Sequence, residues 1–306
     1  MRPRIPAHAI GLLLALTLLA GPAWAQDAAK DAAQDVESVT VTGARAHRII
    51  QNYVKSLAAP ARVTGKITRW QDGICPITVG LRPEAVKFID EQLRAVAQEA
   101  GAPVNEKPDC VPNIEIVFTT DPQGLMDTVR KERPQLLGYA DNQAKMAALA
   151  TFTGPVQAWY TTQTRDINGE TVIDMAHHKG MPQNGVPPDA IVMKSTGLRL
   201  GDGLTSDFYH VVVAADPTKL TDYPIGQIAD YIALLALSHV DKPGDCQPLA
   251  SILNLLAPGC RTVPDGLSTA DMAYLDGLYR RMNGGMNAGL QRGQIARQIE
   301  QEAVGR

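Results

Sequence analysis

The chain has 306 residues, of which 45% are hydrophobic and 20% charged, and its formal net charge is −3. A negative balance argues against nucleic acid as a partner, because proteins that bind nucleic acid present positive charge to the phosphates. The hydrophobic content is sufficient for one large core or two modest ones. We therefore expect a compact globular protein.

The first 25 residues have the pattern of a cleavable secretory signal peptide. Arg2 and Arg4 precede an apolar run from Ile10 to Ala20, and Ala23-Trp24-Ala25 is a small-x-small cleavage pattern. The run is shorter than the roughly 20 apolar residues of a membrane helix, and no later segment approaches that length. We expect an exported protein, periplasmic or secreted, with no membrane span after cleavage, and a retained anchor is the alternative. Removing the two arginines would take the charge from −3 to −5.

The four cysteines are even in number, which in an oxidising compartment predicts two disulfides. Three pairings are possible in principle. Their spacing favours Cys75 with Cys110 and Cys246 with Cys260. A four-thiolate metal site is the weaker alternative, because no C-x-x-C spacing occurs.

Residues 26–45 contain almost no large apolar side chain, which predicts a flexible leader, and residues 46–306 are interpreted as one domain. Within the leader, the segment from Glu37 to Arg45 resembles the V-T-G-x-R segment near the mature N-terminus of many TonB-dependent outer-membrane receptors. Such a segment can add a strand to a partner. A disordered linker is the favoured interpretation.

Hydrophobic periodicity predicts alternating helices and strands along the domain. The expected helices cover residues 49–57, 84–100 and 122–131; the expected strands cover 74–81, 113–119, 156–162 and 207–215; a polar excursion with a hairpin covers 165–185; and helices follow from Ile225 onward. This order predicts an α+β protein with a mixed twisted sheet and covering helices.

An apolar helix from Gly226 to His239 has the spacing of a zinc motif. In the metzincin metalloproteases, H-E-x-x-H-x-x-G-x-x-H places the zinc ligands and a general base on a helix and its following turn. The corresponding residues in this chain are Ala229, Asp230, Ala233, Ala236 and His239. The spacing matches, but only the last ligand is present.

Two later segments resemble the matrixin branch of the same family. Leu249 to Leu253 resembles the P-S-I-M type turn beneath the metal, although Ala250 stands where that pattern has proline. Leu267 to Tyr279 resembles the L-T-x-x-D…L-Y helix that closes matrixin domains. From the residues themselves, Ser268 or Thr269 is the expected N-cap. The expected buried stripe consists of Met272, Leu275, Leu278 and Tyr279. The resemblance implies a degenerate zincin-like domain, as in secreted bacterial proteins of unknown function.

The missing ligands predict that zinc peptidase activity is absent. A catalytic zinc needs three protein ligands and an open position, and His239 cannot hold the ion alone. We therefore expect no metal, no cofactor and no catalytic residue at this motif. A mixed site of Asp230, His239 and Asp241 is a less favoured alternative. The alanines have a simpler explanation, since small residues allow close helix packing.

The remaining candidate residues are weaker. His177 and His178 are interpreted as a solvated pair, and His210 as a sheet-face residue. Trp70, Trp159 and Tyr160 are candidates to line a groove, although one of the last two must face the core if the strand alternates. No hydrolase elbow or phosphate-binding loop is present.

The sequence thus favours an exported, non-catalytic zincin-like protein, a pseudo-metalloprotease, which binds a peptide, a protein or another envelope component. Two alternatives from other classes stay open. One is an active periplasmic hydrolase with an unrecognised or non-zinc site. The other is a structural envelope protein.

Overall fold

A computed structural model of the chain describes residues 43–174, 193–197, 201–260 and 262–304. Contacts divide the chain into Met1–His47 and Arg48–Arg306, and the fold described below is that of the second unit. The expected signal peptide, most of the leader, and His177 and His178 lie outside the described residues. None of the helices in the described part is long and apolar enough to cross a membrane.

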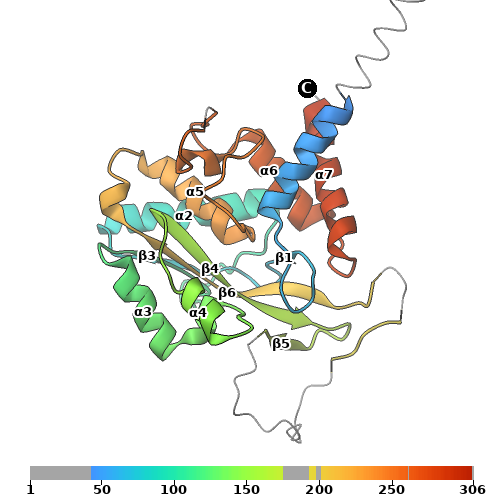
Figure 1. Cartoon of the computed structure of the whole chain (residues 1–306), viewed down its shortest axis with the longest axis horizontal. Coiled ribbons are helices and arrows are strands. Elements are labelled where there is room, and N and C mark those ends of the chain that lie inside the picture. Colours follow the sequence, from blue (N-terminus) through green and yellow to red (C-terminus); the bar gives the residue numbers. More distant parts are fainter. Residues whose placement is uncertain (1–42, 175–192, 198–200, 261, 305–306) are drawn as a thin grey trace, which may run out of the picture. The chain divides into compact units, whose positions relative to one another are not determined.

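A mixed sheet forms the centre of the unit (Figure 1). Its described strands are β1 (Thr68–Arg69), β2 (Pro76–Val79), β3 (Ile114–Phe118), β4 (Val156–Arg165), β5 (Thr171–Ile173) and β6 (Thr205–Ala215). The order is β2-β3-β6-β4-β5, and β1 pairs with β6. β2, β3 and β6 run parallel, whereas β4 is antiparallel to β6 and β5 to β4. The expected α+β class with a mixed sheet is confirmed.

The larger core lies between one face of this sheet and a group of helices. The group comprises the helical residues 48–57, α2 (Pro83–Ala100), α5 (Ile225–Leu237), α6 (Thr269–Asp276), a π-helical turn η4 (Gly277–Arg281) and α7 (Ala288–Val304). Ile114 and Ile116 of β3 and Val211 and Val213 of β6 point into this core and are fully buried. The regular alternation of β3 therefore places its isoleucines against the helices.

The opposite face of the sheet is covered only in part. α3 (Pro122–Glu132), a 3-10 turn η1 (Pro134–Leu137) and α4 (Gln143–Leu149) pack over β4 and β6 and enclose a second, smaller core. The last two of these elements were not predicted. On the same side Ile77 and Val79 of β2 stay 40% and 45% exposed.

Trp70, Trp159 and Tyr160 were expected to be candidates for lining a groove. This expectation is corrected, because helices cover both faces of the sheet at these positions. Trp159 packs into the smaller core and its neighbour Tyr160 packs against the larger one, so alternation along β4 directs each into a different interior. Trp70 and Trp159 are only 1% and 2% exposed. These two tryptophans are core residues and line no open groove.

Both expected disulfides are present. Cys75–Cys110 joins the residue before β2 to the segment that leads into β3, and Cys246–Cys260 closes a loop after α5. No cysteine among the described residues is free. Each bridge lowers the conformational entropy of the unfolded chain and thereby stabilises the folded state.

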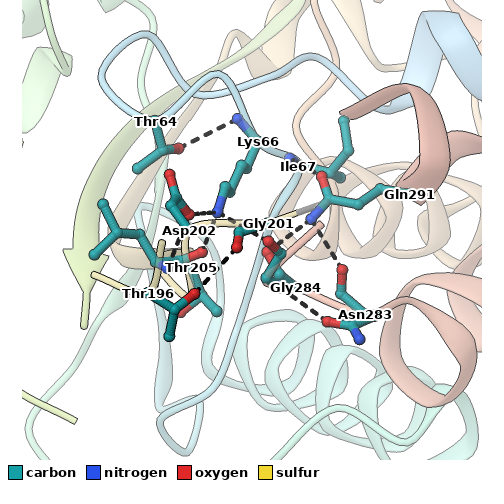
Figure 2. Close-up of polar contacts among 12 residues, drawn as sticks. Thr64, Lys66, Ile67, Thr196, Gly201, Asp202, Thr205, Asn283, Gly284 and Gln291 are labelled. Carbon is teal, nitrogen blue, oxygen red and sulfur yellow. Dashed lines mark hydrogen bonds and ion pairs between the residues drawn. The ribbon is translucent and has the colours of Figure 1, made fainter. Parts of the chain in front are cut away.

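A buried lysine holds three separate segments together (Figure 2). Lys66 is only 4% exposed, and its Nζ donates to the carboxylate of Asp202, to the carbonyl of Leu204 and to the carbonyl of Gly285. Beside it, Gln291 of α7 accepts from the Ile67 N–H at 2.8 Å. The loop before β1, the approach to β6 and the loop before α7 are thus joined by one ammonium group.

Replacement of this lysine should be costly. In Lys66→Met, one carboxylate and two partly buried carbonyls lose their donor, so we expect the free energy of unfolding to fall by about 3 kcal/mol. Chemical denaturation of the purified protein measures the loss. Lys87→Met is the matched control, because the Lys87 side chain is 74% exposed and makes only a surface pair with Glu91; it should change stability by less than about 0.5 kcal/mol. Equal effects of the two substitutions would contradict the assigned role.

Candidate functional site: the buried end of helix α5

Helix α5 carries the positions that resemble the zinc motif and is buried over most of its length after its exposed first residue, Ile225. Its sequence is apolar nearly all round, which is typical of a helix enclosed in a core. Ala229, Ala233 and Ala236 are each at most 1% exposed, and α5 packs closely against α2. The methyl groups of Ala229 and Ala233 therefore occupy the two missing histidine positions, and Ala236 stands where the motif has glycine. The prediction that the helix extends to His239 is wrong, because Ser238 already has extended backbone angles.

The carboxyl end of α5 is capped by four side chains. The last carbonyls of a helix have no partner within it, and burying them without donors is unfavourable. Here each of residues 234–237 accepts a side-chain hydrogen bond. The donors are Ser238 Oγ to Leu234, Tyr160 OH to Leu235 at 3.2 Å, Trp70 Nε1 to Ala236 at 2.9 Å, and Tyr279 OH to Leu237 at 2.7 Å. Side chains far apart in the sequence thus close the end of the helix.

His239, the one retained ligand position, is held among aromatic rings. Its ring centroid lies 4.6 Å from that of Tyr160 and 6.3 Å from that of Phe208. Nδ1 has no hydrogen-bond partner among the described residues, and burial lowers the pKa of the imidazole to about 4, against a weaker opposing effect of Asp241. His239 is therefore neutral at physiological pH, and aromatic side chains pack against it.

Asp230 connects helices and lies apart from His239. Its carboxylate accepts from Gln92 Nε2 of α2 at 2.7 Å and from the Leu267 N–H at 3.1 Å. Seven residues of helical rise separate Asp230 from Leu237, the last residue of α5, by about 10 Å, and Asp241 is exposed. The described residues contain no group of three side chains that could hold a metal ion. The alternative mixed site is thus not assembled.

The two matrixin-like segments meet at one buried carboxylate. Asp271 of α6 accepts from Tyr53 OH at 2.5 Å, from Ser251 Oγ at 2.6 Å, and from the N–H groups of Ile252 and Ser268, both at 2.9 Å. Ser268 is the N-cap of α6 and forms a capping box with Asp271, so the first of the two expected N-caps is confirmed. The predicted stripe is partly right. Leu275 and Leu278 are fully buried, Met272 and Tyr279 partly, and the fully buried Tyr274 was missed.

Open space lies elsewhere on the described part of the chain. Four hollows there are lined by residues outside the degenerate motif. The hollow with the most distinctive chemistry crosses the uncovered half of the sheet and contains His210, which sequence reasoning had placed on a sheet face without a role. Glu115 and Arg133, which join it there, carry no signal in the sequence beyond their charge.

Comparisons with known proteins add no further assignment. No family model matches the chain, and neither the curated proteins nor the solved structures gave a match. The metzincin resemblance consequently depends on the motif spacing in the C-terminal third, and the class that the structure defines is an α+β protein with a mixed sheet.

Loss of the Asp271 charge should destabilise the fold strongly. In the wild type both carboxylate oxygens of Asp271 are surrounded by hydrogen-bond donors. Asp271→Asn replaces one of these oxygens with an NH2 group, which is itself a donor, so we expect a loss of about 3 kcal/mol in the free energy of unfolding. Thermal or urea denaturation tests this. The control is Asp222→Asn at an exposed position, which should stay within about 0.5 kcal/mol of wild type. A loss no larger than that of the control would show that the carboxylate does not join these segments.

The environment of His239 predicts an acid-sensitive fold. The unfolded imidazole takes up a proton below pH 6.5, whereas the folded one does so only near pH 4. Stability from this residue is therefore present above pH 6.5 and is lost as the pH falls toward 4, by about 2 kcal/mol between pH 7 and pH 5. His239→Phe should remove this component, so its denaturation midpoints should depend less on pH. Parallel pH profiles of variant and wild type would contradict the buried, neutral state.

Proposed function

We propose that this chain is an exported, non-catalytic zincin-like protein that binds a peptide or protein of the cell envelope. The observation that carries the proposal is the occupied end of helix α5. Alanine methyl groups stand at the two missing histidine positions, and Trp70, Tyr160 and Tyr279 fill the space around the helix end with hydrogen-bonded rings.

Coordination chemistry supports the absence of zinc catalysis. A catalytic zinc ion is held by three protein ligands and keeps one position for water. His239 would supply one ligand, and Asp230 at the glutamate position is hydrogen-bonded to Gln92 and Leu267. The remaining function of such a domain is to bind without cleaving.

Two features support a location outside the cytoplasm. Both disulfides are of the kind that persists in oxidising compartments. The pattern of residues 1–25 agrees with export through a signal peptide. An envelope partner follows from that location.

Metal and activity measurements test the proposal directly. Residues 26–306, prepared with both disulfides formed, are incubated with zinc, dialysed and assayed for bound metal and for cleavage of a broad peptide mixture. We expect well under one zinc per chain and no cleavage. One tightly bound zinc together with peptidase activity would overturn the proposal.

Restoring the motif provides a sharper test of the same site. In the double variant Ala229→His and Ala233→His, two imidazoles must enter a packed core, and we expect each to cost about 1–3 kcal/mol of stability without creating a zinc site. Ile225→His is the control, because Ile225 lies on the same helix and is 44% exposed. Denaturation with and without zinc measures both effects. A double variant that zinc stabilises would show that the metal position is still open.

A further inference from the structure

A groove of about 770 Å³ crosses the half of the sheet that α3, η1 and α4 leave uncovered. Its volume lies within the range of small-ligand and peptide sites. Ile77 and Val79 of β2, Leu136 of η1 and Ile173 of β5 form much of its apolar lining. A β-bulge in β6 against β4 leaves Tyr209 without a partner residue, and this tyrosine also lines the groove.

The apolar side chains that line the groove are exposed to solvent, and a disulfide restrains one rim of the groove. Ile77, Val79 and Tyr209 are 40%, 45% and 44% exposed, and Val111 at the rim is 84% exposed. Val111 follows Cys110 directly, so the disulfide to Cys75 restrains that rim. Grouped apolar residues on a rigid surface are typical of a binding site rather than of random exposure.

Charged groups lie within this apolar groove. His210 is nine-tenths buried, and its Nε2 has no hydrogen-bond partner among the described residues, the nearest carboxylate oxygen being Glu115 Oε1 at 3.4 Å. The imidazole of His210 holds the pKa of Glu115 below its ordinary value, and Arg133 acts in the same direction more weakly. Arg133 also lines the groove and forms no ion pair with any described residue. A carboxylate and a guanidinium therefore face the same space.

The edge of β2 beside the groove is closed to an added strand. Pro76 has no N–H, and Asp90 of α2 accepts from Thr78 Oγ1 at 2.7 Å and also from its backbone. Because Cys75 bonds toward β3, alternation directs residues 76 and 78 to the outer edge. Proline and occupied backbone groups at an edge disfavour strand pairing. An occupant of the groove must consequently bind by contacts other than pairing with the edge of β2.

We propose that this groove binds the free amino-terminal end of an apolar peptide. The ammonium group of the peptide lies at Glu115, Arg133 donates to its first carbonyl oxygen, and its first side chains pack on Ile77 and Val79. The inference rests on the proposed peptide-binding function and names its site and ligand class. Charge complementarity selects this end of the peptide, because a carboxyl terminus at the same place would face the ionised Glu115.

Binding of three short peptides to the mature protein tests the proposal by calorimetry. The probes are Leu-Val-Gly-amide, its N-acetylated form and Gly-Gly-Gly-amide. We expect Leu-Val-Gly-amide to bind. Acetylation should weaken its binding about tenfold, because the charge-assisted contact of the amino group is lost. The glycine peptide should bind more weakly still, because its apolar packing is lost. Glu115→Gln should weaken binding of Leu-Val-Gly-amide by a similar factor. The variant protein should then bind this peptide and its acetylated form with equal affinity.

Matched variants locate the binding. Glu132→Gln removes an exposed carboxylate that does not line the groove and should leave the affinities unchanged. Val79→Asn should reduce the affinity of Leu-Val-Gly-amide, whereas Val63→Asn, at a valine that is 51% exposed but lies outside the groove, should not. Circular dichroism confirms that each variant is folded.

Three results would overturn the inference: no binding of the free peptide, equal affinity for the acetylated form, or binding that Glu115→Gln and Val79→Asn leave unchanged. The last result would place the peptide elsewhere and leave the proposed function standing. Stoichiometric zinc with peptide cleavage would instead overturn the proposed function, whatever these variants do.

Discussion

The buried carboxyl end of helix α5 is the constraint on which the rest of the structure depends. An apolar helix can pass through a core, but its terminal carbonyls must find donors there. Tyr160, Trp70 and Tyr279 come from three different parts of the chain to provide them. Strand β4, the segment after β1 and the turn after α6 are therefore held around one helix end. The same hydrogen bonds that satisfy the helix end therefore also position these segments against one another.

A second kind of constraint is the burial of charge with complete pairing. Asp271 accepts four hydrogen bonds from three segments, and Lys66 donates to one carboxylate and two carbonyls. Such groups are tolerated in an interior because every lone pair or proton has a partner. They fix how the C-terminal helices meet the sheet. Both buried charges therefore have a structural role.

Function is accordingly proposed on the other face of the sheet. There the covering layer is incomplete, and Glu115, His210 and Arg133 share an apolar groove without a full set of partners. Unsatisfied polar groups beside exposed apolar ones are unfavourable for stability alone, and a ligand would relieve both. The two faces therefore have different roles, one for packing and one for binding.

The local sequence pattern and the spacing of particular residues determined several strands, one long helix, the disulfides and a helix cap. Periodicity predicted the strands around Ile116 and Val213 and the long helix α2, because alternation and helical stripes are local properties. Cysteine spacing gave both disulfides, and Ser268 was recognised as a possible cap from its neighbours. Tertiary structure alone decided that Trp70 and Tyr160 cap α5, that Asp230 binds Gln92, and that Glu115 meets His210. Those contacts join residues far apart in the sequence, and only the packing of the sheet and helices brings them together.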